Sequence, residues 1–289
     1  MEYREQPPRP ELTGLVRCFW QVRGPGRVGV PERVIPDGCA EIVLNQAGAF
    51  RRFAADGSSH RQDHVLLVGQ LGRAITIAPE GDVDLLGIRF EPGGLARLLD
   101  APMAELADVD VGLRHLHRDL HGRLEAAAVA TSFEGRVQRI EAVLLRARAT
   151  TRPRPQAGLV AAAVSRLART SHPVEQVAAG LGVARRTLER AFRTDVGLSP
   201  RDFVRVCRLQ RVVQRLEGGL PTGGWATLAV DAGYFDQSHL IRDFRQIAGT
   251  TPARFLAEQN PLTEAFAAAV SQSSNPHDGQ RPSVRTDPA

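Results

Sequence analysis

The sequence contains no lysine, few aromatic residues and only three cysteines among its 289 residues. Cys18, Cys39 and Cys207 are too few and too scattered for a disulfide framework, which favours a reducing compartment. There is no uncharged apolar run long enough for a transmembrane span. The first residues lack the apolar segment of a signal peptide. We therefore expect a cytoplasmic protein without a membrane partner.

All 37 basic residues are arginines, against 32 acidic residues. A GC-rich coding bias is the simple explanation, although every arginine also presents a planar fork suited to phosphates and guanines. The positive excess is local. Residues 158–260 hold 14 arginines and 9 acidic residues, whereas residues 1–157 hold 21 and 20. This distribution indicates a polyanionic partner for residues 158–260.

The apolar patterns predict an α+β fold in two parts. Short strands separated by Gly, Pro, Asn and Asp are expected at 34–35, 40–44, 64–68, 74–77 and 85–90, and helices at 92–99, 113–130 and 133–149. Residues 1–148 should therefore form a small β-sheet or barrel with helices. The proline-containing stretch 149–157 predicts a linker, and residues 158–260 have helical patterns throughout. The polar stretch 271–289 predicts a disordered tail.

An internal repeat lies within the basic part. Phe192-Arg193, Gly197, Ser199-Pro200 and Phe203 recur 52 residues later as Phe244-Arg245, Gly249, Thr251-Pro252 and Phe255. Upstream, the pattern from Ala178 to Gly182 recurs from Ala229 to Gly233. The glycines suit left-handed helix ends, and Ser-Pro and Thr-Pro suit an N-cap followed by the first helical residue. The repeat therefore predicts two helix-turn-helix units joined by a long helix over 200–217.

The second helix of each unit has one apolar and one polar face. Leu188, Ala191 and Phe192 are expected to be buried in the first unit, and Leu240 and Phe244 in the second. The opposite faces carry arginine, glutamine and glutamate, whose side chains can pair with base edges in a major groove. A solvated helix face is the alternative. For the arginine stripe of the joining helix (Arg201, Arg205, Arg208, Arg211, Arg215), solvation or pairing with acids such as Asp202 and Glu217 is an equal alternative to DNA contact.

Residues 160–258 resemble the DNA-binding domain of AraC/XylS-type transcription regulators, above all the stretch 233–245 followed by Gly249-Thr-Thr-Pro252. The resemblance implies seven helices and double-stranded DNA as the partner. By position it implies base-facing residues Arg186, Glu189, Arg190, Gln237, Ser238, His239 and Arg242, and phosphate-facing residues Arg193 and Arg245. Two departures are Ala184, where a serine cap is usual, and Gly223-Gly224, where a better helix start is usual.

The first part carries two further motifs, 33–41 (RVIPDGCAE) and 89–94 (RFEPGG). They resemble an uncharacterised domain that often precedes such DNA-binding modules and is related to their cupin-like sensor domains. This resemblance implies effector binding, dimerisation or both. Asp37, Cys39 and Glu41 alternate, so on a strand they would share one face, as an effector pocket or thiol sensor. The alternative is a turn aspartate, a buried cysteine and an exposed glutamate.

The remaining motifs carry no chemistry that we can assign. His117 and His121 have the i, i+4 spacing of metal ligands, but a third ligand and the HExxH glutamate are missing, so solvated histidines are expected. No catalytic residue, metal site or cofactor is predicted, because no phosphate-binding loop or nucleophile elbow is present.

The sequence thus predicts a sequence-specific transcription regulator that is not an enzyme. A small-molecule effector, a homodimer and RNA polymerase are further partners that the resemblance implies, and activation and repression both stay open. Two alternatives remain: a DNA-binding module fused to a cysteine-dependent enzyme or repair domain, and an oligomerisation scaffold with a solvated basic face.

Overall fold

The structure is a computed structural model that describes residues 1–169, 172–217 and 219–257, so the predicted tail at 271–289 lies outside it. The described chain has the expected α+β architecture, with a β-rich first part and a helical second part. None of the described helices is both long and apolar enough to cross a membrane.

Two antiparallel sheets form the first part. The larger sheet has the strand order β1 (Glu2–Gln6), β2 (Val16–Gly24), β9 (Val83–Phe90), β4 (Glu41–Asn45), β7 (Val65–Val68) and β10 (Asp110–Gly112). The smaller sheet has the order β3 (Glu32–Val34), β8 (Ile75–Pro79), β5 (Phe50–Phe53) and β6 (Ser59–Arg61). The polar strand β1 was not expected, because an edge strand needs no apolar run; β2, β5, β6 and β10 are further strands beyond those located from sequence.

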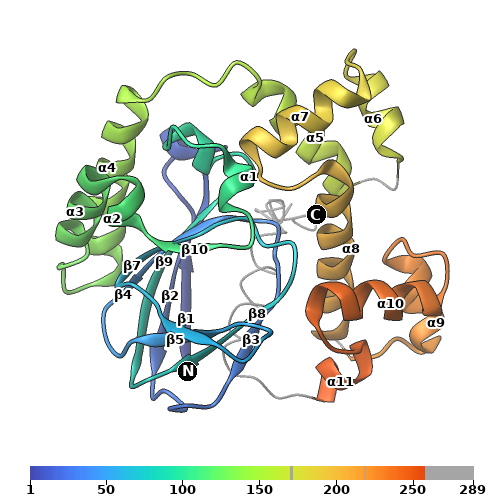
Figure 1. The fold of residues 1–289 in the computed structure, drawn as a ribbon, viewed down its shortest axis with the longest axis horizontal. Coiled ribbons are helices and arrows are strands. Elements are labelled where there is room, and N and C mark those ends of the chain that lie inside the picture. The colour runs from blue at the N-terminus through green and yellow to red at the C-terminus, as the bar shows by residue number, and fades with distance from the viewer. Residues whose placement is uncertain (170–171, 218, 258–289) are drawn as a thin grey trace, which may run out of the picture.

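The central strands are apolar on both faces because both faces are covered. On β2, Phe19 packs toward the helical layer and Trp20 packs between the two sheets. On β9, Leu86 and Leu85 divide in the same way. The outer layer consists of α2 (Leu113–Leu116), α3 (Arg118–Ala127) and α4 (Phe133–Thr150), which lie outside the larger sheet in Figure 1. The near-continuous apolar strands of the sequence therefore belong to a layer buried on both sides.

Two predicted helices differ from the structure. Residues 92–99 contain only a 3-10 turn, Leu95–Arg97, and the short helix α1 (Met103–Leu106) follows. The predicted helix 113–130 is interrupted at His117, whose φ of −153° is not helical. Instead, His117 is the N-cap of α3, and its ring nitrogen accepts a hydrogen bond from the Leu120 backbone N–H. A capping side chain thus splits an apolar pattern that is continuous in the sequence.

Seven helices follow within the described residues: α5 (Ala157–Arg169), α6 (Val174–Gly180), α7 (Arg185–Asp195), α8 (Pro200–Glu217), α9 (Gly224–Asp231), α10 (Gln237–Ala248) and α11 (Pro252–Ala257). Figure 1 shows α8 running between two helical groups, α5–α7 at one end and α9–α11 at the other. The predicted linker is not a free spacer, since Arg154 donates to the carbonyl oxygens of Ala96 (2.9 Å) and Leu99 (2.8 Å) in the first part.

Candidate DNA-binding surface and effector cavity

The two turns of the repeat have the same hydrogen bonds. In the first unit, the Val183 backbone N–H donates to the Ala178 carbonyl, and in the second the Tyr234 N–H donates to the Ala229 carbonyl. The preceding glycines, Gly182 and Gly233, both have positive φ, at 70° and 88°. Each unit is therefore a helix, a glycine turn and a second helix, α6–α7 and α9–α10, as the repeat predicts.

The exits from α7 and α10 also match. Ser199 Oγ accepts from the Asp202 N–H at 3.1 Å, and Thr251 Oγ1 accepts from the Arg254 N–H at 3.2 Å. Pro200 and Pro252 are the first residues of α8 and α11. Each unit is closed by an edge-to-face aromatic pair, Phe192–Phe203 at 5.8 Å and Phe244–Phe255 at 5.5 Å between ring centroids. The repeated side chains thus build a repeated core.

The polar faces of α7 and α10 are open to solvent. The apolar stripe residues Leu188, Ala191, Phe192, Leu240 and Phe244 are fully buried. Seven of the nine predicted DNA contacts are exposed: Arg186, Arg190, Arg193, Gln237, Ser238, Arg242 and Arg245. Ala184 makes no capping bond at the start of α7, as the sequence suggests, whereas at the start of α10 Asp236 accepts from the His239 N–H at 2.6 Å.

The other two predicted base-facing side chains are engaged within the protein. Arg185 Nε donates to Glu189 Oε1 at 2.7 Å, and Arg185 also pairs with Glu175. The His239 ring packs edge-to-face on Tyr234, with 5.2 Å between centroids. A base contact by either residue would therefore require an existing contact to break.

The arginine stripe of α8 mostly attaches this helix to the second unit. Arg205 pairs with Asp243 of α10 at 2.6 Å, and Arg215 pairs with Asp231 of α9 at 2.9 Å. Arg211 donates to the carbonyl of Ala168 in α5 at 2.6 Å, and Arg208 lies 6.0 Å from the centre of the Tyr234 ring. Arg205 and Arg215 thus pair with acids, as the alternative has it, whereas Arg208 contacts an aromatic ring and Arg211 a backbone carbonyl.

We compared the sequence with models of known protein families. Residues 177–258 match the model of a helix-turn-helix domain. This segment begins within α6 and contains the rest of both units, their joining helix and the stretch 233–252. Residues 177–258 are an AraC-type DNA-binding domain. The chain therefore carries the DNA-binding module of a transcription regulator.

The part ahead of the AraC-type domain also matches a family. Residues 4–112 match a domain of unknown function, DUF6597. This match agrees with the motifs at 33–41 and 89–94 and names no ligand. No protein of curated function matches the chain in sequence.

Solved structures are similar to this chain only weakly. ToxT from Vibrio cholerae O395 has 9% identity and a TM-score of 0.47, over 83% of this chain and 97% of that one. ToxT of strain SCE256 with a bound unsaturated fatty acid has 11% identity and a TM-score of 0.45, over 82% and 94%. The AraC-like activator CuxR has 15% identity and a TM-score of 0.30, over 72% and 85%.

A cavity lies between the two sheets of the first part. It has a volume of about 90 Å³ and is mostly apolar, and its walls come from both sheets and from α8 of the AraC-type domain. The apolar walls include Val43, Phe50, Leu66, Ile77 and Leu85. Asp37, Cys39 and Glu41 all line it, so the structure brings the three predicted pocket residues together.

The three residues do not share one strand, however. The strand β4 begins only at Glu41, and Asp37 and Cys39 lie in the loop before it, where Gly38 has a φ of 85°. The Asp37 carboxylate accepts from the Cys39 backbone N–H at 2.9 Å and so closes this turn. Glu41 is not exposed either, since its side chain is 14% accessible.

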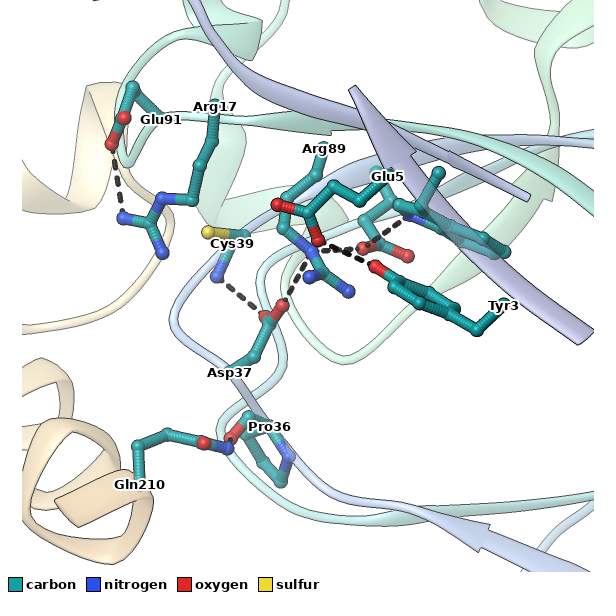
Figure 2. A network of polar contacts seen from close by, with 11 residues as sticks. Tyr3, Glu5, Arg17, Pro36, Asp37, Cys39, Arg89, Glu91 and Gln210 are labelled. Atoms are coloured by element: carbon teal, nitrogen blue, oxygen red, sulfur yellow. Dashed lines mark hydrogen bonds and ion pairs between the residues drawn. The ribbon is translucent and has the colours of Figure 1, made fainter. Parts of the chain in front are cut away.

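Arg89 of the second DUF6597 motif binds both carboxylates of the first. Its Nε lies 2.7 Å from Glu41 Oε1 and 2.9 Å from Asp37 Oδ2, and its side chain is 2% exposed. Trp20 Nε1 also donates to Glu41, at 3.2 Å. Figure 2 shows Asp37 reaching up to Arg89 from the loop, and Gln210 of α8 reaching the same loop at Pro36. Arg89, Trp20 and Gln210 were missed because each is remote in sequence from the 37–41 motif.

The thiols have no activating surroundings. Burial raises the pKa of the Cys39 thiol well above its ordinary value, and the Asp37 carboxylate adds to the rise, while Arg17 opposes it. Burial likewise raises the pKa of Cys18 to about 12 and that of Cys207 to about 11. All three cysteines are free. Within the described residues, no three His, Cys, Asp or Glu side chains are grouped so as to hold a metal ion.

One exposed residue at the N-terminal end of α10 was not predicted as a functional residue. Phe235 directly precedes the N-cap of α10 and is 88% exposed. A phenylalanine is rarely left so open without a partner, and the N-terminal end of a recognition helix is the end that contacts base edges. No role was assigned to it from the sequence, because exposure of a single phenylalanine has no signal in the spacing.

Proposed function

We propose that the protein is a sequence-specific, effector-responsive transcription regulator that works on double-stranded DNA in the cytoplasm. Residues 158–260 bind DNA, and residues 1–148 bind a small molecule that alters this binding. The observation that carries the proposal is the position of α7 and α10. Their polar faces are exposed to solvent, while their C-terminal ends contact the β-rich part.

Base choice is assigned to Arg186 and Arg190 of α7 and to Gln237, Ser238 and Arg242 of α10. Arginine pairs with guanine and glutamine with adenine in the major groove. Arg193 and Arg245 lie one turn further along their helices, so we assign them to phosphate. Glu189 and His239 keep their predicted base-facing roles only if binding frees them from Arg185 and Tyr234.

The proposed coupling runs through two loops that line the cavity and contact the AraC-type domain. The first is 36–39, where Gln210 of α8 donates to the Pro36 carbonyl and Gly38 lies against Phe203. The second is 69–74, where the Ala74 N–H donates to the Ile247 carbonyl of α10 at 2.6 Å. Leu71 in this second loop also lines the cavity. A ligand that moves either loop would therefore move α8 or α10.

Fluorescence anisotropy with a labelled duplex, selected for binding and titrated at several salt concentrations, tests the DNA-binding assignment. Arg190→Ala and Arg242→Ala should each cost about 1–3 kcal/mol on the preferred duplex and little on a random one. Arg245→Ala should weaken both duplexes alike and reduce the salt slope by about 1. Equal affinity for selected and random duplexes would contradict sequence-specific binding.

No observation favours the cysteine-dependent enzyme, because every thiol pKa is raised rather than lowered. A homodimer and contact with RNA polymerase stay predictions.

A further inference from the structure

The polar end of the cavity has more negative than positive charge. Among the described residues that line it, Arg89 is the one cation, and Asp37, Glu41 and Asp63 are acidic. Asp63 is paired outside the cavity with Arg114 at 2.9 Å. Asp37 and Glu41, in contrast, share the Nε–H of the single guanidinium of Arg89. With both carboxyls ionised, the Arg89 cluster carries one uncompensated negative charge in an apolar enclosure, where such a charge is costly. Burial accordingly raises the pKa of Glu41, with Arg89 opposing the rise and Asp37 adding to it.

A third acceptor comes from the DNA-binding domain. Gln210 is 6% exposed and lines the cavity, and its amide nitrogen is occupied by the Pro36 carbonyl. Its Oε1 is buried and has no hydrogen-bond partner in the protein. A buried amide oxygen without a donor is unfavourable by about 1–3 kcal/mol. The amide oxygen of Gln210 and the carboxylates of Asp37 and Glu41 are thus three hydrogen-bond acceptors available to a ligand that carries N–H donors.

These features select among the possible occupants. An anion would add a second uncompensated charge beside Asp37 and Glu41, whereas a protonated amine neutralises the first one and offers three N–H donors. The guanidinium Nη1 of Arg89, also without a hydrogen-bond partner in the protein, would donate to the oxygen of a neighbouring water. The cavity volume of about 90 Å³ holds roughly six to nine water-sized groups, which limits the ligand to about that number of non-hydrogen atoms.

We infer that the cavity binds a small primary amine in its protonated form. The apolar part of the amine lies between the sheets, among Val43, Phe50 and Leu85, and its ammonium group lies against Asp37, Glu41 and Gln210. This inference gives the class of ligand for the proposed effector site. It rests on the proposed function only in one respect, namely that binding of the amine regulates DNA binding. Binding itself is independent of DNA.

Isothermal titration calorimetry on the full-length protein tests the inference. The probes are benzylamine, 3-methylbutylamine and cyclohexylmethylamine, together with benzyl alcohol and benzoate as neutral and anionic compounds of similar size. At least one amine should bind with a Kd below about 1 mM, and about tenfold more tightly than benzyl alcohol and benzoate. Failure of all three amines to reach that affinity overturns the inference, as does tighter binding of the alcohol or the carboxylate.

Substitutions separate charge recognition from a structural role of the cluster. Glu41→Gln and Asp37→Asn should each weaken the binding amine by about tenfold and leave benzyl alcohol unchanged. The control Glu80→Gln makes the same change at a carboxylate that pairs with Arg51 outside the cavity, and should have no effect. Equal losses for amine and alcohol in the two cavity variants would mean that the cluster only maintains the fold. If these variants do not fold, the comparison of probes on the unaltered protein decides.

The same protein is then titrated with the selected duplex, with and without the amine. DNA binding without any amine binding refutes the ligand class and leaves the regulator intact. Amine binding that leaves the duplex affinity unchanged supports the site and refutes its role as the effector site.

Discussion

Buried charge and exposed aromatic surface distinguish the functional residues at the scale of single side chains. Arg89 is buried but holds two carboxylates from another motif. Phe235 is apolar but almost fully exposed. Both depart from the usual location of their residue types, and each departure lies in a region to which we assign binding. Two predictions belong to this scale.

The three thiols should be inert in the folded protein. Because burial raises the pKa of Cys18, Cys39 and Cys207, very little thiolate is present at pH 8. We expect an aromatic disulfide reagent at pH 8 to react slowly with native protein and to detect all three thiols after denaturation. One thiol that reacts rapidly in the native state would revive the cysteine-dependent alternative.

Phe235 should contribute to base choice through the thymine methyl group. Its ring stands at the N-terminal end of α10 with no core to enter, and apolar contacts with the thymine methyl are a known means of readout. Phe235→Ala should weaken the selected duplex by about 1 kcal/mol, near the lower end for a single base pair. Val230→Ala, at another exposed apolar residue on α9, serves as the control. Equal effects of both variants on random DNA would contradict a role in specificity.

The repeat provides matched pairs of elements. Gly197 and Gly249 occupy equivalent turns with φ of 99° and 67°, where an L side chain is strained. A Cβ on Gly197 would also lie 2.8 Å from the Met103 carbonyl oxygen, whereas the nearest atom to a Cβ on Gly249 is 4.0 Å away. The first turn therefore packs more closely against the β-rich part than the second turn does.

Alanine should therefore affect the two turns unequally. Gly249→Ala should lower the free energy of unfolding by about 1–2 kcal/mol through backbone strain. Gly197→Ala should cost more, because Met103 must also move. Urea unfolding curves of the two variants measure the difference. If both variants lose the same stability, the close contact between Gly197 and Met103 is not present in solution.

The sequence predicted elements well where one local rule determines them. The paired glycines, caps and aromatic residues of the repeat all lie where their spacing placed them. Prediction failed where a tertiary contact decided the outcome. Asp37 pairs with Arg89, which is remote from it in the sequence, and no spacing within the 33–41 motif indicates this pair. The cap that His117 provides for α3 is a local contact, but it was missed as well, because solvated histidines were expected at 117 and 121. The cavity itself was beyond prediction, because its walls come from two sheets and a helix 121 residues beyond Arg89.

At the scale of the whole molecule, the β-rich part contacts both helix-turn-helix units at once. It meets the first unit at the Gly197 turn and the second at Ile247, and Gln210 joins it to the helix between them. The relative placement of α7 and α10 therefore depends on the part that contains the cavity. An effector that binds in the cavity as proposed would therefore change the distance between α7 and α10, and with it the spacing of the two DNA segments that they contact.

Selection of bound sequences from a random duplex pool, carried out in parallel with the unaltered protein, Arg190→Ala and Arg242→Ala, tests the central claim most directly. Two reading helices in successive major grooves predict two short motifs about 10 base pairs apart, with each variant relaxing one motif and sparing the other. A single motif, or the loss of both motifs in either variant, would contradict a double reader.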